Sequence, residues 1–199
     1  MRKALLSSLF LAAVASTLGS VLACGGGSAD TSAQPVVPKA ADMDKGARPP
    51  APTKPDSDKV TWKQGAPYAS CHNDVKTGAD LVAGVTAMAQ GCAALTKMHQ
   101  IGATVQGTRQ NLDPAQVIPL HAEAHHCYRA FGLSEGALQD LDIAIIDSAG
   151  KSTGEDGSDS PDSVVLEDGE ICFTQADDVK VNVAAGSGGG KFAVEIWGD

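Results

Sequence analysis

The first segment of the chain whose residue types could bind a cofactor is 68–72, which reads YASCH. A c-type haem attachment site has the pattern C-x-x-C-H, in which two cysteines form thioether bonds and the histidine ligates the iron. Cys71 and His72 match the end of that pattern, but Tyr68 stands in place of the first cysteine. Attachment through Cys71 alone would leave another cysteine, Cys92, without a partner. We therefore predict that Cys71 forms a disulfide and that no haem or other cofactor is bound.

A serine nucleophile is suggested by GKSTG at residues 150–154, which matches G-x-S-x-G. A nucleophile elbow of this type needs its triad histidine later in the chain than the serine. Every histidine instead precedes Ser152: His72, His99, His121, His125 and His126. The run GSGGGK at residues 186–191 departs from phosphate-loop spacing, because Ala185 and Phe192 stand where glycine and a hydroxyl residue are needed. We expect no catalytic residues and predict that the protein is not an enzyme.

The segment HAEAHHC, residues 121–127, offers potential metal ligands. On one extended strand it would place His121, Glu123, His125 and Cys127 on the same face. Neighbours along a single strand do not close a tetrahedral site, and Cys127 is needed for a disulfide. We therefore expect exposed or half-buried histidines here and no metal site.

A group of acidic residues, Asp140, Asp142 and Asp147, is followed by EDGSDSPD at residues 155–162. Carboxylates are the hard oxygen ligands that calcium prefers, but the spacing of an EF-hand is absent. A solvated acidic loop is the main interpretation. Calcium binding by these loops is the alternative.

The start of the chain, residues 1–23, predicts a secretory signal peptide, because Arg2 and Lys3 precede a short apolar run that ends in small residues. The next residue is Cys24, and the tetrapeptide VLAC resembles the lipobox of bacterial lipoproteins. This resemblance implies cleavage before Cys24 and acylation of its thiol, and two or more acyl chains anchor a protein stably. We expect a lipid-anchored cell-envelope protein. Gly25 after the cysteine favours the outer membrane, at its periplasmic face or at the cell surface.

Residues 24–60 predict a disordered tether. They hold six of the ten prolines and few large apolar side chains. Such a segment cannot bury enough surface to offset the entropy lost on ordering. The folded part would then begin near residue 61 and stand away from the membrane.

The charge of the chain excludes one class of partner. The formal net charge is −9, and between residues 132 and 199 three lysines stand against fifteen acidic residues. A surface of this sign repels phosphate backbones, so we expect no nucleic-acid binding. The expected partners are the membrane, through the lipid anchor, and other proteins of the envelope.

Four cysteines remain after Cys24, namely Cys71, Cys92, Cys127 and Cys172. An even number in an exported chain implies two disulfides, for which three connectivities exist. We expect Cys71 to pair with Cys92 and Cys127 with Cys172, because each pair then lies within one structural unit.

The apolar pattern divides the folded part into two segments. Within residues 61–110, a spacing of three and four predicts a short helix over 79–90 and a second turn or helix over 92–99, separated by a break. Residues 111–199 instead alternate in short runs, which predicts an antiparallel β-sandwich of jelly-roll-like form. The expected fold class is therefore α+β and mainly β. The glycine-rich run before Phe192 would join the last two strands as a hairpin.

Two runs in this region, LQDLDIAIIDSAGKSTGED at residues 138–156 and EICFTQADDVKVNVAAGSGGGKFAVEIW at 170–197, carry a family resemblance. They resemble the β-sandwich called the bacterial pre-peptidase C-terminal (PPC) domain. With GCAALTKM, HHCYRAFG and IWGD, the wider chain resembles a group of Gram-negative lipoproteins without an assigned activity. The resemblance implies a β-sandwich and brings no catalytic residues. Such sandwiches usually accompany a peptidase domain, for which this sequence offers no counterpart.

These observations predict a lipid-anchored module that acts through its β-sandwich in non-catalytic binding or structural support. The hairpin loops are the expected contact surface, because loops on a rigid scaffold commonly carry binding residues. The alternative function is a calcium- or carbohydrate-binding sandwich within a surface complex.

Replacement of the lipobox cysteine tests the anchor. In Cys24→Ala, we expect loss of metabolic labelling by an alkyne-tagged fatty acid and a shift of the protein from the membrane pellet to the soluble envelope fraction. The matched control is Cys92→Ala, which removes a cysteine without touching the lipobox. Fatty-acid labelling that persists in Cys24→Ala would disprove the prediction.

Overall fold

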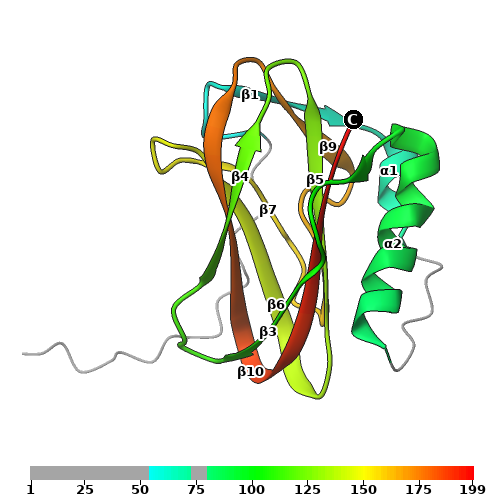
Figure 1. The fold of residues 1–199 in the computed structure, drawn as a ribbon, viewed down its shortest axis with the longest axis vertical. Helices are drawn as coiled ribbons and strands as arrows, with labels where there is room; N and C mark the ends of the chain where they lie inside the picture. Colours follow the sequence, from blue (N-terminus) through cyan, green and yellow to red (C-terminus); the bar gives the residue numbers. More distant parts are fainter. Residues whose placement is uncertain (1–53, 73–79) are drawn as a thin grey trace, which may run out of the picture. The chain divides into compact units, whose positions relative to one another are not determined.

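Residues 54–72 and 80–199 are the part of the chain that this computed structural model describes (Figure 1). The predicted signal peptide, Cys24 and the predicted tether up to residue 53 lie outside the described residues. The last residues of that predicted tether are ordered, since the Ser57 side chain is buried and its hydroxyl donates to Asp147 Oδ2 at 2.7 Å. The folded part therefore extends to the N-terminal side of residue 61.

Period-two alternation yields strands over most of the described chain, and the prediction of a mainly β fold is confirmed. The strands are β1 (Val60–Gln64), β2 (His99–Gln100), β3 (Val105–Gln110), β4 (Gln116–Ala122), β5 (Cys127–Ser134), β6 (Ala137–Ile146), β7 (Ser152–Glu155), β8 (Asp162–Val164), β9 (Gly169–Phe173) and β10 (Asp177–Gly198). The helices are α1 (Ala66–Ser70) and α2 (Leu81–Thr96). All strand pairs are antiparallel, and the main order is β1-β9-β5-β10-β6-β7.

The long strand β10 organises these pairings. Its first part pairs with β4 on one side and β6 on the other, whereas its last part pairs with β2 and β3 on one side and β5 on the other. The predicted hairpin at GSGGGK is therefore wrong, because the chain continues as one strand through register shifts between Ala185 and Gly188. Gly188 has a φ of 76°, and a Cβ there would collide with the carbonyl oxygen of Ala137. These glycines let a single strand bend and change partners.

The core follows the alternation that the sequence predicts. The same-face triplets of β6 and β10 are all buried in one cluster: Leu141, Ile143 and Ile145; Val179, Val181 and Val183; Phe192, Val194 and Ile196. Strand β5 differs because it is buried along its whole length. One of its faces meets this core, and the other contributes Phe131 and Leu133 to a second cluster with Val85 and Met88 of α2. The helix therefore covers the outer side of the β5–β10 pair (Figure 1).

Helix α2 corrects the expected helix break. It is one continuous helix that begins after Asp80, whose carboxylate accepts hydrogen bonds from Val82 N and Ala83 N at 2.9 and 3.1 Å. The glycines inside it serve close packing. A Cβ at Gly84 would lie 2.6 Å from Leu133 Cδ2, and one at Gly91 would lie 2.5 Å from the Cys71 carbonyl oxygen.

A buried carboxylate joins α2 to the sheet. Glu195 of β10 is 1 % exposed, and its Oε1 accepts hydrogen bonds from the hydroxyls of Thr86 at 2.6 Å and Thr104 at 2.8 Å. Its Oε2 accepts a hydrogen bond from the indole N–H of Trp197 at 3.0 Å. A buried carboxylate is costly unless it is fully hydrogen-bonded, and three donors meet that requirement here. Glu195 thus ties the helix and the β2–β3 connection to one point of β10.

Both expected disulfides are present. Cys71, at the end of α1, is bonded to Cys92 of α2, and Cys127 of β5 is bonded to Cys172, its register partner in β9.

The expectation of a helical segment over 61–110 needs correction, because that segment also supplies β2, β3 and most of β1. These strands pair with β9 and β10, so residues 61–110 share the sheet of the later strands. Neither described helix is long and apolar enough to cross a membrane.

The bend in β10 can be tested by substitution. Gly188→Ala combines a positive φ, which costs about 1–2 kcal/mol, with a backbone collision of the overpacking kind, which costs roughly 1–3 kcal/mol. We expect urea unfolding to show a loss of about 2–5 kcal/mol in the free energy of unfolding.

Gly136→Ala is the matched control. Gly136 has a φ of 77°, but no heavy atom lies within 4 Å of the point that a Cβ would occupy there. That variant bears only the backbone cost of about 1–2 kcal/mol. Equal losses in the two variants would contradict the role of close packing at Gly188.

Candidate functional site

The cysteine-containing candidates are structural. Two groups of potential ligands lie within 4.8 Å of one another in the described residues: Cys71, His72 and Cys92, and Cys127, Glu170 and Cys172. In both groups the two sulfur atoms are joined to each other. Metal binding and haem attachment both require free thiols or thiolates, which these cysteines do not provide while oxidised. Residues 68–72 therefore contribute a disulfide and the end of α1.

Asp140 and Asp142, two of the acidic residues proposed as calcium ligands, have neighbouring carboxylates, because a Cβ at Gly186 would meet an oxygen of each, but Asp147 lies apart from them. Asp142 and Asp147 are separated along and beyond β6 by roughly 16 Å, given the rise of an extended strand. The Asp147 carboxylate already accepts the Ser57 hydroxyl and the backbone N–H groups of Ala149 and Lys151, at 2.7, 2.9 and 2.8 Å. Those hydrogen bonds lower the pKa of Asp147 against the opposing effect of burial. Its role is to hold the turn after β6.

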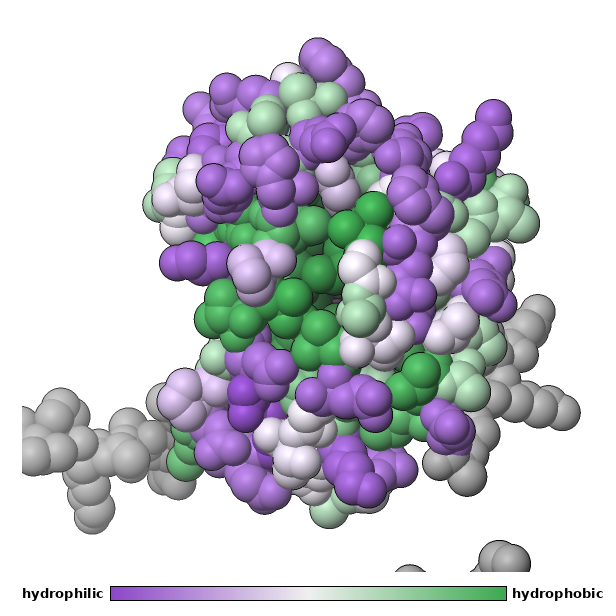
Figure 2. Space-filling view, in the orientation of Figure 1, coloured by the Kyte–Doolittle hydropathy of each residue, from purple (hydrophilic) through white to green (hydrophobic). Residues whose placement is uncertain are grey.

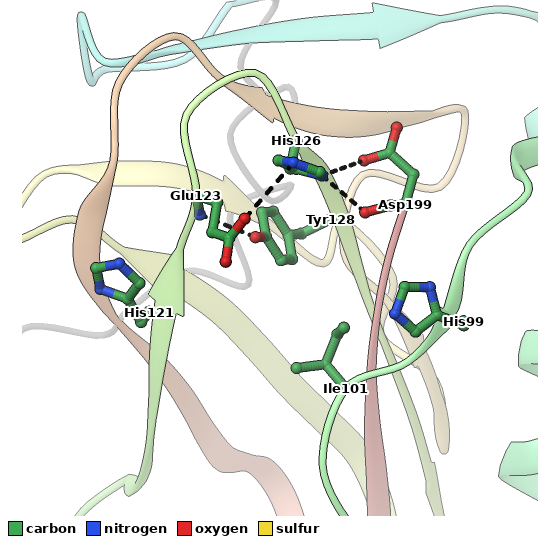
Figure 3. Close-up of a pocket in the computed structure, with 7 residues that line it drawn as sticks. All are labelled: His99, Ile101, His121, Glu123, His126, Tyr128 and Asp199. Carbon is green, nitrogen blue, oxygen red and sulfur yellow. Dashed lines mark hydrogen bonds and ion pairs between the residues drawn. The ribbon is translucent and has the colours of Figure 1, made fainter.

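A cleft lies where β4, β5, β2 and the end of β10 converge (Figure 3). It has a volume of about 300 Å³ and is lined by His99, Ile101, His121, Glu123, His126, Tyr128 and Asp199. His121 belongs to β4, His99 to β2 and Tyr128 to β5, whereas Glu123 and His126 lie in the turn between β4 and β5. Figure 3 shows His99 and Ile101 on the wall opposite His121. These segments are distant in the sequence, and they are brought together because β2, β4 and β5 all pair with β10.

The β4–β5 turn aims His126 toward this cleft. His125 adopts a left-handed conformation with a φ of 68°, and His126 N donates to the Glu123 carbonyl oxygen at 3.4 Å. The prediction that residues 121–127 form one strand is therefore wrong, because β4 ends at Ala122 and β5 begins at Cys127. As a result the cleft is lined by His126 and does not include His125.

His126 lies between two acidic residues. Its Nδ1 is 2.8 Å from the Asp199 main-chain oxygen and 3.4 Å from Asp199 Oδ1, and its Nε2 is 3.6 Å from Glu123 Oε2. A carbonyl oxygen only accepts hydrogen bonds, so Nδ1 carries a proton and donates it. This hydrogen bond raises the pKa of His126, and the Asp199 and Glu123 carboxylates add to that effect against partial desolvation.

His121 has a carboxylate partner of its own. Its Nδ1 is 2.7 Å from Asp178 Oδ1, with both side chains largely exposed. The hydrogen bond to Asp178 raises the pKa of His121, and the two charges attract each other once the imidazole is protonated. The Nε2 atom of His121 is not used by this contact.

Tyr128 and Asp199 stabilise the turn between β4 and β5 through hydrogen bonds. The Tyr128 hydroxyl accepts a hydrogen bond from Glu123 N at 2.9 Å, and its ring packs edge-on against Phe173 with centroids 5.7 Å apart. Burial raises the pKa of Tyr128, so the phenol keeps its proton at neutral pH. Asp199 Oδ1 accepts a hydrogen bond from Cys127 N at 2.8 Å. The turn is therefore held by side chains from β5 and from the end of β10.

A groove continues from the cleft along the molecule. Among the described strands, β2, β3 and β4 pair only with β10, so β4 has one free edge and so do β2 and β3. Ile101 and Ile118 are only partly buried where they pack on the core. Figure 2 shows apolar residues gathered in a hollow in the middle of this face, between polar margins. We call the hollow between β4 and the β2–β3 segment the edge groove.

A second buried polar group contains Arg129, whose side chain is fully buried. Its guanidinium carbon lies 5.1 Å from the Phe131 ring centroid and 5.8 Å from that of Tyr68. Burial lowers the pKa of Arg129 to about 10, and the nearby Glu170 carboxylate opposes this shift. Arg129 therefore remains charged at neutral pH. It is enclosed by protein and does not line the cleft.

Sequence reasoning considered part of this site but rejected it as a metal site. It selected His121 and Glu123 as potential ligands, but it grouped them with His125 and Cys127 on a strand face that does not exist. It missed His99 and Asp199, which reach the cleft only because the end of β10 lies between β2 and β5. No local pattern in the sequence marks these residues, since their proximity depends on long-range strand pairing.

Histidine titrations test the electrostatics of the cleft. In long-range ¹H–¹⁵N spectra recorded across pH, we expect His121 and His126 to titrate at higher pH than His72, because desolvation lowers the pKa of His72 and the Arg129 charge lowers it further. Asp178→Asn should return the His121 pKa toward its ordinary value and leave His126 unchanged. A His121 titration that is insensitive to Asp178→Asn would refute this assignment.

Comparisons with known proteins add little to this description. No protein-family model and no curated protein matches the chain. Among solved structures, the VP2 subviral particle of infectious bursal disease virus matches with 12% identity and a TM-score of 0.28, over 51% of this chain and 30% of that chain. The structure of the Gx strain of the same virus matches with 11% identity and a TM-score of 0.28, over 51% of this chain and 31% of that chain. The chain thus spans about a third of these viral chains, and scores this low carry no argument about fold or function.

Proposed function

We propose that the protein is a lipid-anchored, non-catalytic binding module of the cell envelope, and that it binds an extended segment of another envelope protein in the edge groove. The observation that carries the proposal is the pair of free strand edges on β4 and β2–β3, with partly buried Ile101 and Ile118 between them. A free strand edge presents unpaired backbone N–H and C=O groups, which an added strand can satisfy. The groove takes the place of the hairpin loops as the expected contact surface.

The chemistry of the groove defines the partner segment. Alternate side chains of an added strand point to the same face, so apolar residues at every second position would contact Ile101 and Ile118. The margin near the cleft carries the exposed carboxylates of Glu123 and Asp178, and the whole chain has a formal net charge of −9. Opposite charge favours and steers association, so the partner segment should carry lysine or arginine beside its apolar positions.

The arrangement around β10 supports a β-sandwich of jelly-roll-like form. One group of strands consists of β4, the first part of β10, β6 and β7, and the other consists of β2, β3, the last part of β10, β5, β9 and β1. Core side chains from both groups, such as Ile143 and Ile171, belong to one buried cluster. Two sheets that share one core and are joined by a strand that bends between them would form such a sandwich.

The composition of the cleft supports a binding role over catalysis. In the described part of the chain, His121 contacts a carboxylate, His126 contacts a main-chain oxygen, and the cleft lining contains no serine or thiol. The calcium alternative receives no support from Asp147, which is committed to the turn after β6. Anchoring through Cys24 at the outer membrane would place the edge groove where envelope proteins can reach it.

Site-specific photo-cross-linking in intact cells tests this function. We expect a benzophenone amino acid at position 118 or at position 101 to capture the same peptide, with alternating apolar residues and nearby basic residues. Position 117 is the matched control, because Val117 is 51% exposed and points to the opposite face of the same strand. Recovery of that peptide from position 117 as well, or of lipid alone from positions 101 and 118, would exclude the proposed partner.

A further inference from the structure

Two potential metal-ligand atoms in the cleft form an ion pair without a hydrogen bond. Glu123 Oε2 and His126 Nε2 lie 3.6 Å apart, which is too far for a hydrogen bond. Two atoms that ligate one Zn²⁺-sized ion at about 2.0–2.1 Å lie roughly 3.4 Å apart in a tetrahedral site. The gap between these atoms therefore fits a single ion that contacts both.

The imidazole of His126 is held in the orientation that metal binding requires. Its Nδ1–H donates to the Asp199 main-chain oxygen at 2.8 Å, so the neutral ring has its lone pair on Nε2, the atom that faces Glu123. Metal-bound histidines almost always donate their other N–H to a carbonyl or carboxylate, which fixes the tautomer. His121 Nδ1 lies 2.7 Å from Asp178 Oδ1, and this contact does not use its Nε2.

We propose that Glu123 and His126 bind a divalent transition-metal ion in the cleft, with His121 as the third protein ligand. Among the described residues, no third ligand atom lies within 4.8 Å of both, so His121 completes the set only if it moves. The His121 side chain is 64% exposed and lies two residues before Glu123, and its Nδ1 contact with Asp178 would have to break for Nε2 to reach the ion. A cleft of about 300 Å³ leaves room for water to complete the coordination.

The donor set selects the class of metal. Two imidazole nitrogens and one carboxylate suit Zn²⁺, Ni²⁺ and Cu²⁺, whereas Ca²⁺ requires six to eight oxygen ligands. Affinity should follow the general order for such sites, with Cu²⁺ above Ni²⁺ and Zn²⁺. This inference is independent of the edge groove, because it concerns the isolated protein and an ion.

Calorimetry on the chain without residues 1–23 tests the site at pH 7.5. We expect one Zn²⁺ or Ni²⁺ ion per chain, no heat with Ca²⁺ and at least a tenfold weaker affinity in His126→Ala and in Glu123→Gln, since even loss of an outer-shell partner costs about 10–100-fold. The matched control is His125→Ala, which removes the adjacent histidine outside the cleft and should bind as tightly as the wild type.

A second measurement needs no substitution. Addition of Ni²⁺ to the ¹⁵N-labelled wild-type chain should broaden the resonances of Glu123, His126 and His121 before those of other residues. The proposal is overturned if neither Zn²⁺ nor Ni²⁺ binds at micromolar concentration, if His125→Ala weakens binding as much as His126→Ala, or if broadening is centred elsewhere. A chain that binds metal but yields no peptide from the edge groove would leave this site standing and reject only the proposed function.

Discussion

The structure depends on the backbone of β10, which forms strand pairs on both of its edges in its first part and again in its last part. Each wall of the edge groove is hydrogen-bonded to this one strand, β4 to its first part and β2–β3 to its last part. The separation of the walls is therefore set by how β10 bends between Ala185 and Gly188. Asp178 and Asp199, at opposite ends of the same strand, reach the two histidines of the cleft for the same reason.

Buried polar groups fix the position of α2 on the sheet, which apolar packing alone would leave adjustable. The hydrophobic effect is non-directional, so the contacts of α2 with Phe131 and Leu133 would tolerate small shifts of the helix. Glu195 removes that freedom, because one carboxylate must meet donors from α2, from the loop before β3 and from Trp197. Since β2 follows α2 closely in the chain, the same carboxylate also positions the wall that carries His99 and Ile101.

Local sequence patterns predicted much of the fold, for identifiable reasons. The faces formed by Ile143 and Ile145 and by Val181 and Val183 were predictable because strand periodicity is local, and the disulfide pairs followed from cysteine count and proximity in sequence. The continuity of β10 was not predictable, since glycine-rich runs are common in hairpin turns and only the tertiary pairing here keeps the chain extended. The cleft was found only in part, because the positions of His99 and Asp199 depend on strands that are distant in sequence.

The order of the cysteines along the chain has a consequence for how the protein acquires its bonds. The two bridges are consecutive and do not interleave, with separations of 21 and 45 residues. If the chain enters an oxidising compartment from its N-terminus and Cys24 is acylated as proposed, Cys71 and Cys92 would be exposed before Cys127 arrives, so the first pair formed would be the correct one. The second bridge joins facing residues of two paired strands and needs no partner from the helical region. Maturation can then proceed by oxidation alone, without a requirement for later reshuffling by an isomerase.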